Sequence, residues 1–160
     1  MTTPEENAAT VKELIQKVLN EGDIGFAEKT LSEDYVERTP MQGGTADKAG
    51  AIAMFNMMRD MTPDMHIDVD DVIATGNKVA VRSTMTGTDT KGAMPGMPPT
   101  GKSFSIGAMD VFTFDDASPG QFRYIERKRA LEIDPNSAVG IWLDFSSRHA
   151  DWGKRATFCL

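Results

Sequence analysis

The hydrophobic period of this 160-residue chain changes near position 65, and this change limits the folds open to it. Up to Met61, apolar residues such as Val11, Leu14 and Val18 recur at helical spacing. From Met65 onward they alternate with polar residues, which is typical of strands that bury one face. Helices that precede a set of antiparallel strands pack together on one face of the resulting sheet. The chain is therefore predicted to be an α+β protein.

The elements that this pattern predicts are separated by glycine, proline and asparagine signals. Gly22 marks the end of the first helix, and Gly76-Asn77 forms a tight turn between two strands. Predicted helices span 5–20, 23–31 and 46–61, and predicted strands span 35–38, 65–75, 79–86, 104–114 and 121–131.

The segment Met94–Lys102 separates two of the β-rich runs. It holds three prolines and two glycines in nine residues, and proline cannot continue a strand because it lacks the ladder N–H. It is predicted to be a long, shaped loop. Binding and catalytic groups concentrate on loops held by a rigid sheet, although an ordinary connector fits the composition equally well.

Charge and cysteine content exclude several classes of protein. The formal net charge is −7 and the pI is about 4.8, so the basic footprint of a nucleic-acid binder is missing. No apolar run approaches the length of a membrane span. The single cysteine, Cys159, excludes an internal disulfide and a cysteine-rich metal site. The polar N-terminal segment 1–7 lacks the features of a secretory signal, and a cytoplasmic location is expected.

Several stretches together resemble the SnoaL-like polyketide cyclase family, within the nuclear transport factor 2-like superfamily. They are Asp34-Tyr35-Val36 with Thr39-Pro40, Pro63–Ile67, Asp71–Arg82, Gly87–Lys102 and Asp110-Val111-Phe112. The resemblance implies a cone-shaped barrel, built from a curved antiparallel sheet with the N-terminal helices on its concave face. It also implies a deep apolar pocket for a small hydrophobic molecule, a homodimer formed through the outer sheet face, and no metal or other cofactor.

Asp110 is the first candidate for a catalytic group. On the segment 104–114 the other even-numbered positions are aromatic or aliphatic. If this face is the core face, burial penalises the charged carboxylate and its pKa is expected to rise. Such a carboxyl can take a proton from carbon next to a carbonyl and return one to oxygen. A structural carboxylate paired with Arg82 is the alternative.

Arg82 and His66 complete the predicted catalytic set. Arg82 is expected to face the pocket, where its guanidinium could hold Asp110 or polarise a substrate carbonyl, and a surface arginine is the alternative. His66 has an ordinary pKa suited to acid–base work, although a solvated strand position fits it well. His66, Asp68 and Asp70 share one strand face, but no other suitable ligand cluster is visible and no metal is predicted.

The substrate-binding residues are predicted to be an adaptable apolar lining with one hydroxyl. Methionine side chains suit irregular ligands, while plain core packing explains most of them equally well. The predicted lining comprises Tyr35, Met54, Phe55, Met58, Met97, Phe104 and Phe112.

The C-terminal part departs from the family pattern from about residue 117. The resemblance implies a last strand with a His-Trp pair followed by an aspartate, which is the principal acid–base residue in the polyketide cyclases. The segment 121–130 contains neither. The chain is therefore divided into a SnoaL-like barrel domain, 1–133, and an atypical tail, 134–160.

Three classes of function follow from these observations: a cofactor-free enzyme, a non-catalytic binding domain, and an inactive or structural dimerising domain. The first is a cofactor-free enzyme of the cyclase type, which closes a ring by an intramolecular aldol step on a hydrophobic carbonyl compound. The second is a non-catalytic domain that binds a small hydrophobic molecule. The related limonene epoxide hydrolases are a variant of the first class, but they carry an arginine and an aspartate two residues apart where this chain has Arg82 and Thr84.

Overall fold

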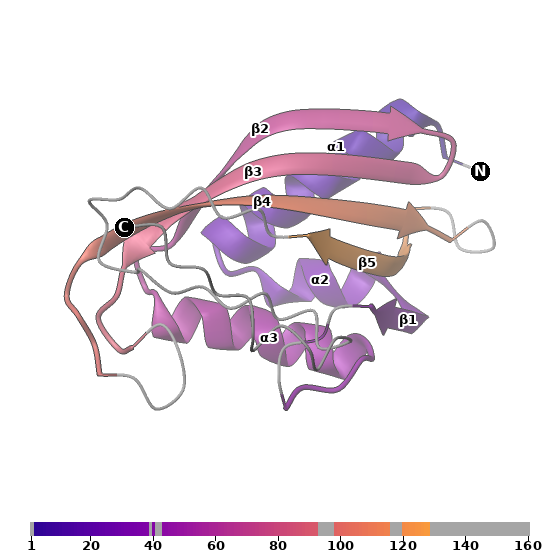
Figure 1. Ribbon diagram of the computed structural model, residues 1–160. Coiled ribbons are helices and arrows are strands. Elements are labelled where there is room, and N and C mark those ends of the chain that lie inside the picture. Colours follow the sequence, from indigo (N-terminus) through magenta and orange to yellow (C-terminus); the bar gives the residue numbers. More distant parts are fainter. Residues whose placement is uncertain (1, 39, 41–42, 93–97, 116–119, 129–160) are drawn as a thin grey trace, which may run out of the picture.

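A computed structural model of the chain describes residues 2–38, 40, 43–92, 98–115 and 120–128 (Figure 1). Its elements confirm the predicted order of helices followed by strands. The predicted tail, 134–160, lies outside the described residues. No helix in the described part of the chain is long and apolar enough to cross a membrane.

The helices begin where polar side chains satisfy free backbone N–H groups. Helix α1 (Pro4–Leu14) starts at a capping box in which Thr3 and Glu6 bond each other's backbone, and it continues as a π-helical segment, η1 (Ile15–Asn20). Helices α2 (Ile24–Thr30) and α3 (Lys48–Met61) are capped by Asp23 and Asp47.

Five strands form one sheet in the order β1-β5-β4-β3-β2. Their bounds are Leu31–Glu37 for β1, His66–Thr75 for β2, Lys78–Thr88 for β3, Ser103–Phe114 for β4 and Phe122–Lys128 for β5. The neighbours from β2 to β5 pair antiparallel, and β1 pairs parallel with β5. The prediction of an antiparallel sheet is therefore confirmed for three of the four strand pairs.

The sheet curves around the helices without closing. Strands β1 and β2 stand at its two ends in the described residues, so the predicted cone-shaped α+β fold is confirmed and its curved sheet is open. All three α-helices lie on one side of the sheet, as predicted (Figure 1). Helix α1 packs on β2 and β3, and α3 packs on β1.

Strand β2 contains a bulge that shifts its alternation. The register with β3 slips between Val69 and Asp71, so one extra residue lies in β2. Before the bulge Ile67 points into the core, and after it Ile73 points outward with 70% of its surface exposed. Strict alternation from Ile67 would put Ile73 on the same face, and the inserted residue explains why it is not.

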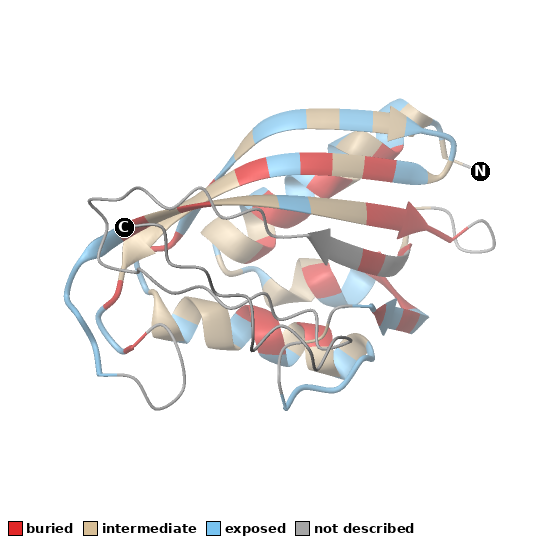
Figure 2. Ribbon diagram, viewed as in Figure 1, coloured by how far each residue is buried: buried red, intermediate tan, exposed pale blue. Residues whose placement is uncertain are grey.

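The core lies between the helices and the concave face of the sheet (Figure 2). Buried residues alternate along β3 and β4, so that Val79 and Val81 face Phe112 and its neighbours across the strands. The tilted rings of Phe112, Phe114 and Phe122 pack together where β4 meets β5, with ring centroids 5.4 and 4.6 Å apart. This packing fixes which side chains of β4 point toward the core.

Candidate active site

Asp110 lies on the inner face of β4. The even-numbered residues Phe104, Ile106, Phe112 and Phe114 of this strand are buried, and strand alternation puts Asp110 on the same face. Asp110 itself is half-buried, and its Oδ1 atom has no contact with solvent. Its position opposite the fully buried Val81 places a carboxylate at the margin of the apolar core.

A second acid, Glu37, is buried on the same inner face, at the end of β1. Only 2% of its surface is exposed, and its Oε2 accepts a hydrogen bond of 3.0 Å from the hydroxyl of Tyr35, which is equally buried. The Glu37 N–H donates to the carbonyl of Ala46, so the backbone here is fixed by the segment that leads into α3. The sequence interpretation named Tyr35 but overlooked Glu37, although alternation from Tyr35 puts both on one face.

The sheet register relates the two acids. Glu37 stands opposite Ile125 of β5, which stands opposite Phe112 of β4, and Asp110 lies two residues from Phe112 along β4. Two strand spacings of about 4.8 Å and two residues of about 3.4 Å separate their Cα atoms by roughly 12 Å on a flat sheet. Both carboxylates therefore stand on the concave side, too far apart to share one proton.

Arg82 points away from both acids. It lies between the buried Val81 and Ser83 of β3, so its side chain is on the outer face and is 54% exposed. Its guanidinium donates to Asp71 at 2.7 and 3.0 Å and to Asp70 at 3.3 Å. The expectation that Arg82 faces the pocket beside Asp110 is therefore wrong.

His66 also lies on the outer face. Its imidazole is 55% exposed, and its Nε2 stands 3.3 Å from Oδ1 of Asp68. This matches the solvated interpretation rather than a position on the inner face. In the described residues no three His, Cys, Asp or Glu side chains come together as metal ligands, and this includes the pattern that begins at His66.

The predicted lining residues lie mostly in the core. The residues with 5% or less of their surface exposed are Tyr35, Met54, Phe55, Phe104 and Phe112. Met58 is partly buried and packs against this cluster, whereas Met97 lies outside the described residues. Helix α3 thus contributes an apolar face that packs on β1, the strand that holds Glu37.

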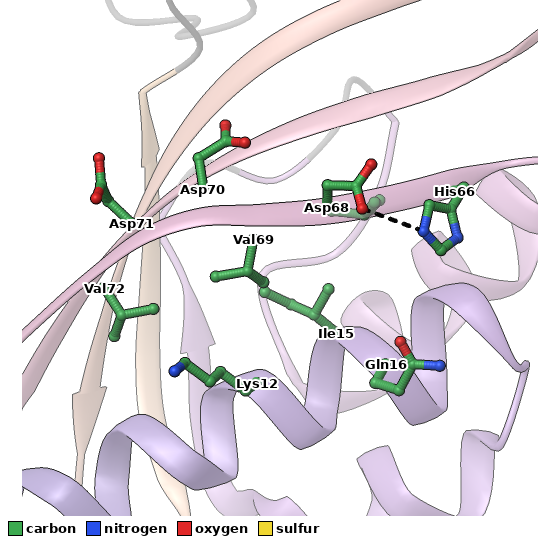
Figure 3. A pocket seen from close by; sticks show the side chains of 10 residues that line it. Lys12, Ile15, Gln16, His66, Asp68, Val69, Asp70, Asp71 and Val72 are labelled. Carbon is green, nitrogen blue, oxygen red and sulfur yellow. Dashed lines mark ion pairs between the residues drawn. The ribbon is translucent and has the colours of Figure 1, made fainter.

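A groove of about 400 Å³ lies elsewhere, between α1–η1 and the edge strand β2. Figure 3 shows Ile15, Val69 and Val72 in the space between helix and strand, while Asp70 and Asp71 project from the other side of β2. Both backbone groups of Ile67 at this edge are bonded by the Asn20 amide, at 2.8 and 3.0 Å. None of the predicted lining residues borders this groove.

Asp89 fixes the base of the proline-rich loop. This carboxylate is 4% exposed and accepts hydrogen bonds from the Gly92 N–H, the Thr100 N–H and the Thr100 hydroxyl, at 2.8 to 3.0 Å. The Asp89 N–H also donates to the carbonyl of Lys102. These bonds join the two ends of the loop, so Asp89 is a structural carboxylate that the sequence interpretation did not single out.

The α+β arrangement with an open, curved sheet matches the nuclear transport factor 2-like fold. A family model, SnoaL-like polyketide cyclase, matches residues 9–118. The match covers more than half of the chain, and the chain belongs to this family. No curated protein sequence is significantly similar to the chain.

Solved structures support the same fold. TsrD from Streptomyces laurentii is 22% identical and superposes with a TM-score of 0.70, over 81% of this chain and 91% of that chain. IdmH from Streptomyces antibioticus, described as a polyketide cyclase, is 24% identical with a TM-score of 0.65, over 77% and 91%. An LEH-like epoxide hydrolase from M. tuberculosis is 15% identical with a TM-score of 0.58, over 79% and 84%.

The family and these neighbours together support a function of the cyclase or isomerase type and a small-molecule ligand. At these identities the structural likeness concerns the fold. The chemistry must therefore be argued from the residues on the inner face of the sheet.

Proposed function

We propose that this protein is a cofactor-free cyclase or isomerase that acts on a hydrophobic carbonyl compound, with Asp110 as its general acid–base group. The observation that carries the proposal is the position of Asp110 on the inner face of β4, with Oδ1 out of contact with solvent. A carboxylate at the margin of an apolar core suits proton transfer at carbon, because water does not compete for the proton.

The proposed reaction balances without a cofactor. A carboxylate removes a proton from the carbon next to one carbonyl, and the resulting enolate carbon attacks a second carbonyl of the same molecule. One carbon–carbon bond forms, the attacked carbonyl oxygen receives the proton, and the product is an isomer of the substrate. Positioned acid–base help of this kind is typically worth ~10²–10⁴-fold in rate.

The lining of the site supports an apolar substrate. Met54, Phe55 and Phe112 belong to one buried aliphatic and aromatic cluster on the inner side of the sheet, and thioether side chains adapt to irregular ligands. The epoxide hydrolase alternative loses support, because Arg82 is engaged with Asp70 and Asp71 on the outer face. The homodimer implied by the family stays a prediction.

The test follows proton exchange at the α-carbon of 2-tetralone, a hydrophobic aryl-fused ketone, in D₂O by proton NMR. The wild-type protein should accelerate exchange over buffer, and Asp110→Asn should reduce the acceleration by about 10²-fold or more. Asp68→Asn, the same substitution on the outer face, should leave it unchanged. If the wild-type protein binds the ketone, as judged by chemical-shift titration, but gives no acceleration, the non-catalytic binding domain is the better assignment.

A further inference from the structure

The groove of about 400 Å³ between α1–η1 and strand β2 lies outside the site that carries Asp110. Small-molecule sites in proteins usually enclose about 300–1,000 Å³, so the groove is large enough for a small ligand. Its middle is apolar, because Ile15 of η1 lies across the space from Val69 and Val72 of β2 (Figure 3). Both walls belong to packed elements of the fold rather than to a loop.

Lys12 of α1 brings an ammonium group to this groove. Figure 3 shows its side chain reaching from the helix into the space below β2. The residues four positions away on the same helix are Ala8 and Gln16, so no acid lies there to neutralise it. Lys17, by contrast, pairs with Glu13 at this spacing, with 3.6 Å between nitrogen and oxygen. Among the described residues, the ammonium of Lys12 has no ion pair and no hydrogen bond.

The acids that border the groove are engaged with other partners. Asp70 and Asp71 project from the opposite side of β2 and pair with Arg82 at 3.3 and 2.7 Å (Figure 3). Asp68 pairs with His66, with 3.3 Å between Oδ1 and Nε2. The ammonium is thus the one charged group on the helix wall of the groove. Because acids stand nearby and the net charge is −7, a ligand with one negative charge is favoured over a phosphate with two.

The helix wall changes from α-helical to π-helical at Ile15. Segments of π-helix are rare and are frequent at functional sites. Here η1 contributes Gln16 to the lining, and its last residue, Asn20, bonds both backbone groups of Ile67 through its amide. The groove therefore has a cation on the side of Val72 and amide groups toward Ile67, with apolar side chains between them (Figure 3).

We infer that this groove binds an amphipathic monocarboxylate, such as a fatty acid of medium chain length. The carboxylate accepts charge-assisted hydrogen bonds from the ammonium of Lys12. The hydrocarbon chain lies between Ile15 and Val69, where it leaves water. One negative charge meets one unpaired positive charge, and the apolar middle of the groove selects against small hydrophilic acids such as acetate. The site is separate from the inner face of the sheet and takes no part in the proposed reaction.

The test titrates octanoate into protein with carbon-13-labelled isoleucine and valine methyl groups and follows the NMR shifts. The methyl groups that should shift and saturate together are those of Ile15, Val69 and Val72. Lys12→Met keeps an unbranched side chain and removes the charge, so it should weaken octanoate binding about 3- to 10-fold. Lys17→Met is the matched control, because Lys17 lies over the ring of Phe26 at 4.5 Å and does not border the groove. It should bind octanoate as the wild-type protein does.

Several results would overturn the inference. One is the absence of saturable shifts in the groove, and another is an equal octanoate affinity in the wild-type protein and Lys12→Met. 1-Octanol has the same chain without the charge and should bind the wild-type protein more weakly, so an equal affinity for the two ligands also overturns it. If octanoate shifts Ile106 on the inner face instead of the groove residues, the ligand occupies the other site and the inference fails. The exchange assay with 2-tetralone tests the proposed function independently of all these results.

Discussion

At the scale of single residues, the strand face on which each acid lies determines how far it is buried. Asp110 and Glu37 lie on the inner face, where an acid–base group is sheltered from water, whereas Asp68, Asp70 and Asp71 are paired on the outer face. Composition alone does not distinguish these groups, because all are carboxylates on strands. The strand face on which each carboxylate lies distinguishes them, and that face is decided by which residues the helices cover.

Asp64 offers a pH test at this scale. Its carboxylate accepts hydrogen bonds from the hydroxyl and the N–H of Thr88, which lower its pKa below the ordinary 3.8. A pKa lowered in the folded state adds stability above the unfolded pKa, and this is lost as the pH falls through the folded pKa. The melting temperature of the wild-type protein should therefore exceed that of Asp64→Asn by a constant amount from pH 7 to pH 5. This difference should shrink below about pH 3.8.

The readout for this prediction is a series of thermal melts by circular dichroism. Thr88→Ala removes the hydroxyl that contributes most to the lowered pKa, and in that background the pH-dependent difference should be smaller. A difference that stays constant down to pH 2 would show that the Asp64 charge contributes nothing to stability.

At the scale of elements, one bulge and one side-chain amide shape the edge of the sheet. The bulge near Asp70 moves Val72 inward and Ile73 outward, and the Asn20 amide occupies the backbone groups that Ile67 would otherwise expose. An edge strand that is bulged and partly covered is less available for pairing with another chain. The geometry of β2 thus protects the edge while keeping its apolar residues on the core side.

Matched substitutions in β2 test the bulge. Ile67→Thr should lower the free energy of unfolding by about 2 kcal/mol, because a buried ethyl group is replaced by a hydroxyl. Ile73→Thr should change it by less than about 0.5 kcal/mol, since this side chain is 70% exposed. Urea denaturation measures both. Equal losses at the two positions would mean that β2 alternates without a bulge.

At the scale of the whole molecule, strand β5 connects the N-terminal strand β1 to the antiparallel strands β4, β3 and β2. Strand β5 lies between β4 and β1, so it connects the antiparallel strands to the segment that carries Tyr35 and Glu37. Phe122 and Ile125 of β5 are fully buried in the common core. The sheet needs this strand even though the family match ends at residue 118.

Two truncated chains test the proposed division at residue 133. A chain of residues 1–133 keeps β5 and should unfold cooperatively, as followed by far-ultraviolet circular dichroism. A chain of residues 1–120 lacks β5, leaves β1 without its neighbour, and should lose cooperative unfolding. The division would be rejected if residues 1–133 were also without a cooperative transition.

The sequence by itself determined the order of elements, the approximate bounds of β2, β3 and β4 and the apolar face of β4, because period, capping residues and turn residues act over a few neighbours. Family likeness added the nuclear transport factor 2-like fold, whereas the choice of Asp110 came from the alternation of apolar residues along 104–114. The tertiary structure decided the rest: that Arg82 and His66 face outward, that β1 pairs parallel with β5, that the sheet stays open and that Glu37 is buried beside Tyr35. These depend on which face the helices cover and on a one-residue bulge. Both follow from contacts between segments far apart in the chain, which local pattern does not encode.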